Sequence, residues 1–307
     1  MNKLVGILLA STVLMACKNL KKEKAGSSIK TEFTQVTKDN YELTKPTDNL
    51  KKVLVLFGGF SEKPADIERE FNILQIAKEH NIAIVYMNYS KNLWLEANEK
   101  QQLAEQLQNI FLENKLPTDD IYLGGFSSGG NMALLISAYL NEKTNYKLAP
   151  KGIFIVDSPI DLVALYRSSE KNIANKFSAP AVQESTWIIE TLGKRFGKPD
   201  NNISKYEDYA VYTLQTNHID NLQYLKNTKI RFYTEPDTLW WKVNRKADYD
   251  QMNAFYIKRL YESLQAAGFK QVAYIPTANK GYRANGDRHP HSWSIVDKQE
   301  LMKWIME

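Results

Sequence analysis

The chain has 307 residues, of which 43% are hydrophobic and 24% are charged. These ordinary values argue against a disordered, collagen-like or disulfide-rich chain. The formal net charge is +5, with the basic residues scattered along the sequence. No basic stripe with interleaved aromatic side chains indicates a nucleic-acid partner.

The sequence begins with a short basic start and an apolar run that stops before the single cysteine, Cys17. The run over 4–14 is typical of a secretory signal and is too short for a spanning helix, which needs about 20 residues. The stretch LMAC at 14–17 resembles the lipobox of bacterial lipoproteins. That resemblance implies cleavage before Cys17, attachment of acyl chains such as palmitate to Cys17, and anchoring in a membrane of the bacterial envelope, facing the periplasm or the cell surface. A plain cleavable signal peptide is the alternative.

We therefore divide the chain into a signal peptide (1–16), a polar lipidated tether (17–30) and a folded domain (31–307). In the domain, two short alternating stretches within 31–44 predict a hairpin. Apolar runs then alternate with helical patterns, which indicates an α/β fold with a mostly parallel central sheet and helices on both faces. The later strands are expected at 53–57, 82–87, 120–123, 152–156, 229–233 and 271–275. The helices are expected at 64–79, 98–112, 128–140, 253–267 and 297–306.

One segment, about 158–226, interrupts this alternation between the fourth and fifth predicted parallel strands. It has helix-like stretches and many aromatic residues but no clear buried strand. We predict a helical cap inserted above the sheet.

The most informative motif is G-x-S-x-G at 125–129, centred on Ser127. An apolar strand pattern ends directly before it and an apolar helix pattern begins directly after it, as a nucleophile elbow requires. The flanking glycines allow a tight turn. The backbone N–H of Ser128, at the helix start, would then face developing negative charge.

On these residues the chain resembles the α/β-hydrolase family of esterases, lipases and peptidases, over about 50–307. The family takes its second oxyanion donor from the loop after the strand that runs through 53–57, where Gly59 and Phe60 are the candidates. The pair Gly58-Gly59 is similar to, but shorter than, the HGGG pattern of some esterases, and no histidine precedes it.

The resemblance also implies a triad acid and a histidine that follow Ser127 in the order Ser, acid, His. Asp237, after the strand that follows the cap, is the preferred acid, with Glu235 as the alternative. Some family members take the acid from the loop after the preceding strand, which leaves Asp157 and Asp161 open.

The histidine is expected just before the last helix, where His289 and His291 lie. His291 is preferred because it is nearer the helix and is followed by Ser-Trp, a common pattern there in the family. His289 is then a loop residue that contacts substrate. Arg283 and Arg288 are either ligands for a substrate carboxylate or solvated loop charges.

The sequence thus predicts a lipid-anchored carboxylic-ester hydrolase that acts on a small-molecule ester through an acyl-enzyme, with no metal and no cofactor. Two alternatives stay open. One is an amidase or peptidase with the same triad, and the other is a non-catalytic envelope binding protein on the hydrolase fold.

Overall fold

The computed structural model describes residues 31–176 and 178–307. The predicted signal peptide, the lipidation site Cys17 and the tether over 17–30 lie outside the described residues. Within the described part of the chain, every helix is too short or too polar to cross a membrane.

The centre of the domain is an eight-stranded sheet with the order β1-β2-β4-β3-β5-β6-β7-β8. The first two strands form the predicted antiparallel hairpin at one edge, and every later pairing between β3 and β8 is parallel. This arrangement confirms the predicted α/β fold with a mostly parallel sheet. The strands are β1 (Phe33–Lys38), β2 (Tyr41–Pro46), β3 (Lys52–Phe57), β4 (Ile82–Met87), β5 (Ile121–Phe126), β6 (Pro150–Val156), β7 (Lys229–Thr234) and β8 (Val272–Pro276).

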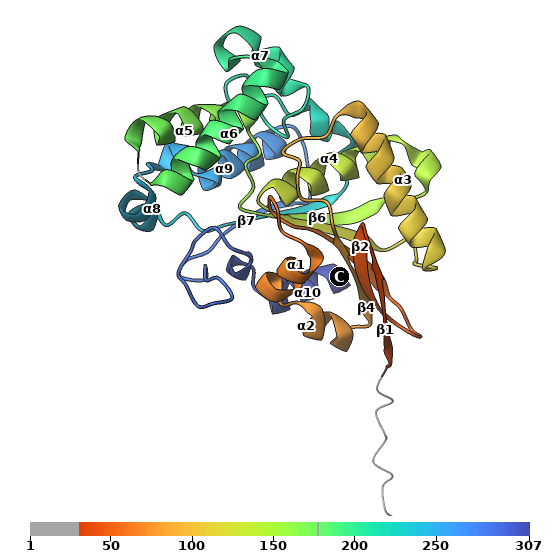
Figure 1. Cartoon of the computed structure of the whole chain (residues 1–307). Helices are drawn as coiled ribbons and strands as arrows, with labels where there is room; N and C mark the ends of the chain where they lie inside the picture. The colour runs from red at the N-terminus through yellow and green to blue at the C-terminus, as the bar shows by residue number, and fades with distance from the viewer. Residues whose placement is uncertain (1–30, 177) are drawn as a thin grey trace, which may run out of the picture. The chain divides into compact units, whose positions relative to one another are not determined.

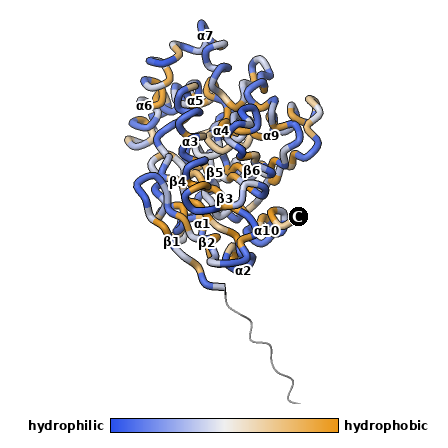
Figure 2. The backbone as a smooth tube through the Cα atoms, turned by 90° about the vertical axis from the view of Figure 1, so that its right-hand side faces the viewer, coloured by the Kyte–Doolittle hydropathy of each residue, from blue (hydrophilic) through white to orange (hydrophobic). Residues whose placement is uncertain are grey.

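Helices cover both faces of the sheet (Figure 1). Side chains alternate along a strand, so β3 contributes Val53 and Val55 to one core and Leu54 and Leu56 to the other. Figure 2 shows the hydrophobic segments gathered in the middle of the domain. The first core contains α3 (Ala97–Glu113), α4 (Ser128–Glu142) and α9 (Asn253–Ala266), and the second contains α1 (Pro64–Phe71), α2 (Leu74–Glu79) and α10 (Lys298–Met306).

The segment between β6 and β7 contains three helices, α5 (Leu162–Asn175), α6 (Ala179–Phe196) and α7 (Pro199–Glu207). They share a small apolar core of their own, which includes Tyr166 and Phe196. Figure 1 shows them above the side of the sheet where α4 begins. We call α5, α6 and α7 the cap helices.

One local prediction was wrong, and one helix was missed. The helix expected over 64–79 is interrupted at Asn72, which adopts a left-handed conformation (φ 47°, ψ 49°) and separates α1 from α2. Asparagine tolerates this conformation better than most residues. A further helix, α8 (Thr238–Arg245), follows Asp237 directly and was not predicted.

Candidate active site

Ser127 lies at the sharp turn between β5 and α4, where the G-x-S-x-G motif predicted it. Its backbone is strained, with φ 51° and ψ −128°, a conformation that a residue with a side chain rarely adopts. Glycines are required on both sides. A Cβ on Gly125 would lie 2.1 Å from the carbonyl oxygen of Gly129, and one on Gly129 would lie 2.3 Å from that of Phe57. Steric contact with the backbone therefore explains why the motif has glycine at 125 and 129 in this fold.

His291 is held by a carboxylate at the end of β6. Its Nδ1 lies 2.6 Å from Oδ2 of Asp157, which is 5% exposed. The backbone around Asp157 is fixed in turn, because its N–H donates to the carbonyl of Tyr233 and its own carbonyl accepts from the Asn253 side chain. An imidazole bound in this way presents Nε2 as its free nitrogen.

Ser127 and His291 line the same cavity, which has a volume of about 670 Å³. No hydrogen bond joins their side chains within the described residues. Such contacts are commonly long in the absence of substrate and shorten in the reacting complex. The arrangement therefore offers a nucleophile (Ser127), a base (His291) and a carboxylate that orients the base (Asp157).

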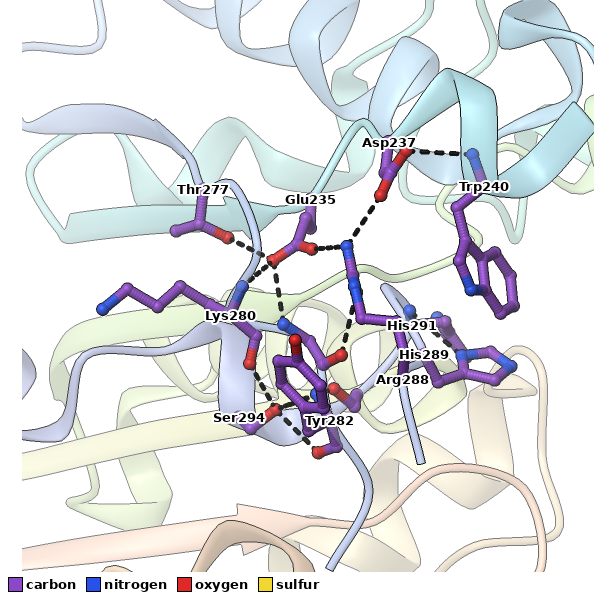
Figure 3. A network of polar contacts seen from close by, with 12 residues as sticks. Glu235, Asp237, Trp240, Thr277, Lys280, Tyr282, Arg288, His289, His291 and Ser294 are labelled. Carbon is purple, nitrogen blue, oxygen red and sulfur yellow. Dashed lines mark hydrogen bonds and ion pairs between the residues drawn. The ribbon is translucent and has the colours of Figure 1, made fainter. Parts of the chain in front are cut away.

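The prediction that Asp237 or Glu235 orients His291 is corrected by this geometry. Both carboxylates bind Arg288 instead (Figure 3). The Arg288 guanidinium lies 2.7 Å from Oδ2 of Asp237, whose Oδ1 accepts from the N–H of Trp240 and so caps α8. Arg288 engages both carboxylates that follow β7, and the carboxylate that reaches His291 is Asp157, at the end of β6.

Glu235 has a structural role that sequence reasoning missed. It is buried, and its Oε2 accepts from the backbone N–H groups of Lys280 and Gly281 and from the Thr277 hydroxyl. Together with the ion pairs of Arg288, these bonds hold the loop that leads to His291 (Figure 3). We call Glu235, Asp237 and Arg288 the clasp.

Asp161, the other acid left open by the sequence, also does not contact His291. Its carboxylate caps α5 by accepting from the N–H of Ala164 and binds the N–H of Leu214. Asp157 directly follows the apolar run that forms β6, but Glu235 and Asp237 follow β7 in a similar way, so the sequence pattern alone does not select Asp157.

His289 lies beside His291 and supports its loop. Its Nδ1 lies 3.2 Å from the backbone nitrogen of His291, and its Nε2 lies 3.1 Å from a guanidinium nitrogen of Arg245. Burial is the largest cause, and together with the neighbouring His291, Arg283 and Arg245 it lowers the pKa of His289 to about 3. His289 is therefore neutral near pH 7, and it lines the cavity as expected of a substrate contact.

The three predicted oxyanion donors differ in their surroundings. The N–H of Gly59 is already engaged, because it donates to Oε2 of Glu62 at 2.7 Å. The N–H groups of Phe60 and Ser128 donate no hydrogen bond within the described residues, and both residues line the cavity. Phe60 and Ser128 are thus the available pair, while Gly59 anchors their loop.

Glu62 is the second residue that sequence reasoning missed. It binds the N–H of Gly59 and accepts from the indole N–H of Trp293 at 3.2 Å, so it ties the loop after β3 to the segment after His291. Burial raises its pKa above the ordinary value for a glutamate.

A larger opening of about 970 Å³ lies elsewhere and is lined by Asp120, Lys151 and Lys229, among others. These residues stand at the amino ends of their strands. Ligand sites of open α/β sheets lie instead at the carboxyl ends, where Ser127 and Asp157 stand. The smaller cavity is therefore the candidate active site.

The fold and the elbow define the chain as an α/β-hydrolase fold protein. No protein-family model and no curated protein sequence matches it. Solved structures with the same fold include an esterase of the bacterial hormone-sensitive lipase family (13% identity, TM-score 0.52, covering 91% of this chain and 84% of that one). They also include an esterase from Rhizomucor miehei (14%, 0.53, 90% and 82%) and an esterase/lipase from an uncultured bacterium (11%, 0.51, 91% and 86%).

Proposed function

We propose that the protein is a serine hydrolase that cleaves carboxylic esters, with Ser127 as nucleophile, His291 as general base and Asp157 as the orienting acid. The observation that carries the proposal is the strained elbow of Ser127 on the same cavity as an imidazole bound to a buried carboxylate. The esterases that share the fold add support for this reaction class.

In the proposed mechanism, Nε2 of His291 accepts the proton of the Ser127 hydroxyl while the serine oxygen attacks the ester carbonyl carbon. The carbonyl electron pair moves to its oxygen, which the N–H groups of Phe60 and Ser128 stabilise. The imidazolium then protonates the leaving alcohol, and an acyl-enzyme remains on Ser127. Water, activated by the same imidazole, releases the acid and restores the serine.

The test is release of p-nitrophenol from acetate and butyrate esters by residues 18–307. Ser127→Ala should abolish turnover, while Ser168→Ala, which alters another serine of the cavity, should retain it. Turnover that survives Ser127→Ala would exclude Ser127 as the nucleophile. A panel of aminoacyl amides in the same assay separates ester hydrolysis from amide or peptide cleavage.

We further propose that Cys17 carries the lipid that anchors the protein in the bacterial envelope. The support is the apolar run and the LMAC stretch before the only cysteine. Several acyl chains would anchor the domain stably, because each buried methylene contributes about 0.8 kcal/mol. Labelled palmitate should be incorporated into the full chain and into Lys18→Ala but not into Cys17→Ser, and only Cys17→Ser should leave the membrane fraction. Labelled Cys17→Ser would overturn the proposal.

A further inference from the structure

The arginines of this protein divide into two groups. Six of the eight form an ion pair with a carboxylate within residues 31–176 and 178–307. The remaining two, Arg245 and Arg283, form none there, and both line the cavity that contains Ser127 and His291. Arginines that stay unpaired inside a partly enclosed site are available for an external anion.

Each guanidinium group lies beside a ring that neighbours His291, namely His289 or Phe126. Arg245 is the last residue of α8 and contacts His289 at 3.1 Å. The guanidinium of Arg283 lies 5.9 Å from the centre of the Phe126 ring, and that ring lies 4.5 Å from the His291 imidazole. The two arginines are half-buried, so a ligand that reaches them is partly shielded from water.

The acidic groups around the cavity do not neutralise this pair. Glu184 lines the cavity but is exposed, and Asp157 is bound to His291. Glu62 is engaged by Gly59 and Trp293, and burial raises its pKa, an effect that the nearby charge of Arg283 opposes only in part. His289 is kept neutral partly by the positive charges of Arg283 and Arg245. The cavity therefore presents two guanidinium groups without an equal number of free carboxylates.

The rest of the cavity wall is partly apolar and aromatic. Phe60 and Trp187 pack together with ring centres 4.5 Å apart, and Leu165 and Ile188 of the cap helices lie on the same wall. Such a surface suits a hydrocarbon or aryl portion of a ligand. The cavity thus combines an apolar wall with two cations.

We infer that the site selects esters that carry a second, anionic group, a carboxylate, which Arg245 and Arg283 bind while Ser127 attacks the ester. This inference rests on the proposed function, since it names the substrate class of that same site. A carboxylate bound by one or both guanidinium groups would fix the substrate in the cavity. The carboxylate belongs either to the acyl part or to the alcohol part of the ester.

The experiment compares matched pairs of esters. For charge on the acyl part, the pair is the mono-p-nitrophenyl ester of adipate and p-nitrophenyl hexanoate. For charge on the alcohol part, the pair is 4-acetoxybenzoate and 4-acetoxybenzamide. We expect kcat/KM for the charged member to exceed that of the neutral member by about tenfold or more in one pair, since one good ionic contact is worth that factor.

Substitution then assigns the preference to the arginines. In Arg245→Gln and Arg283→Gln the ratio of charged to neutral kcat/KM should fall by about tenfold, mainly through KM. Lys242→Gln removes an exposed charge from α8 and should keep the ratio of the unaltered protein. An unaltered ratio in both arginine variants, or a preference for the neutral member of both pairs, would overturn the inference.

A binding measurement separates this inference from the proposed function. Calorimetry with Ser127→Ala should show tighter binding of a charged member, adipate monoester or 4-acetoxybenzoate, than of its neutral counterpart, and Arg283→Gln in the same background should remove the difference. Failure of all ester turnover together with selective anion binding would reject the esterase and keep the anion site. Ester turnover without selective binding would keep the esterase and reject the anion site.

Discussion

Two carboxylates beside the proposed catalytic residues have different tasks. Asp157 binds Nδ1 of His291 and so decides which imidazole nitrogen faces the cavity. Glu62 binds the N–H of Gly59 and so holds the loop that carries Phe60. One carboxylate orients the base and the other positions an oxyanion donor, and each role predicts a different response to substitution.

Replacement of the orienting acid should impair catalysis far more than folding. Asp157→Asn keeps the shape of the side chain but stabilises the wrong imidazole tautomer, so we expect kcat to fall by roughly 10³- to 10⁴-fold. Asp237→Asn is the matched control, because Asp237 binds Arg288 rather than His291. Steady-state kinetics with p-nitrophenyl butyrate measure both. A larger loss in Asp237→Asn than in Asp157→Asn would restore Asp237 as the acid.

Glu62 should tolerate glutamine but not alanine. The amide oxygen of Glu62→Gln can still accept from Gly59 and Trp293, so kcat should change little. Glu62→Ala releases the loop and should lower kcat by roughly ten- to a hundredfold, since small displacements of a positioned group have effects of this size. Equal losses in both variants would show that the negative charge, rather than the loop, is what Glu62 contributes.

His289 predicts a pH dependence of stability. In the unfolded chain its pKa is near the ordinary value of about 6.5, whereas in the folded protein it is about 3. Between these values the unfolded state binds more protons, so the free energy of unfolding should fall as pH decreases from 6.5. The slope stays below about 1.4 kcal/mol per pH unit, because the ring is partly exposed.

Urea unfolding at pH 7.5 and pH 5 measures this effect. His289→Gln should lose part of the difference in unfolding free energy between the two pH values. His80→Gln, which alters the residue at the C-terminal end of α2, should keep that difference. An identical pH response in His289→Gln and the unaltered protein would contradict the assignment.

At the scale of elements, the clasp joins three parts of the chain. Glu235 follows β7, Asp237 caps α8, and Arg288 belongs to the loop that carries His291. The Glu235 side chain is 1% exposed and that of Arg288 is 21% exposed. The pair is thus far from an ordinary surface ion pair, and loss of Arg288 leaves the buried Glu235 carboxylate without its ion-pair partner.

Removal of the clasp cation should therefore destabilise the domain. We expect Arg288→Met to lower the free energy of unfolding by about 3 kcal/mol, as for other broken buried pairs. Lys280→Ala is the control, because Lys280 contributes only its backbone N–H to Glu235. Chemical denaturation compares the two. Equal stability of Arg288→Met and Lys280→Ala would exclude a structural role for the clasp.

At the scale of the whole molecule, sequence patterns predicted the sheet, its helices and the elbow, because burial and glycine spacing are local signals. The partner of His291 was different. Asp157 and Asp237 both follow buried strands, and only their contacts in the folded protein, Asp157 with His291 and Asp237 with Arg288, distinguish them. The break at Asn72 was missed because apolar spacing continues across it, and α8 was missed because none of its residues is buried, so it carries no core pattern.

The close approach at Gly129 has a mechanical consequence. A side chain there would collide with the carbonyl oxygens of Phe57 and Gly58, so the main chain of the elbow rests directly on the main chain that leads into the oxyanion loop. No compressible side chain separates them. The spacing between nucleophile and oxyanion donors is thus fixed, and adaptation to different substrates falls to the cap helices on the other side of the cavity.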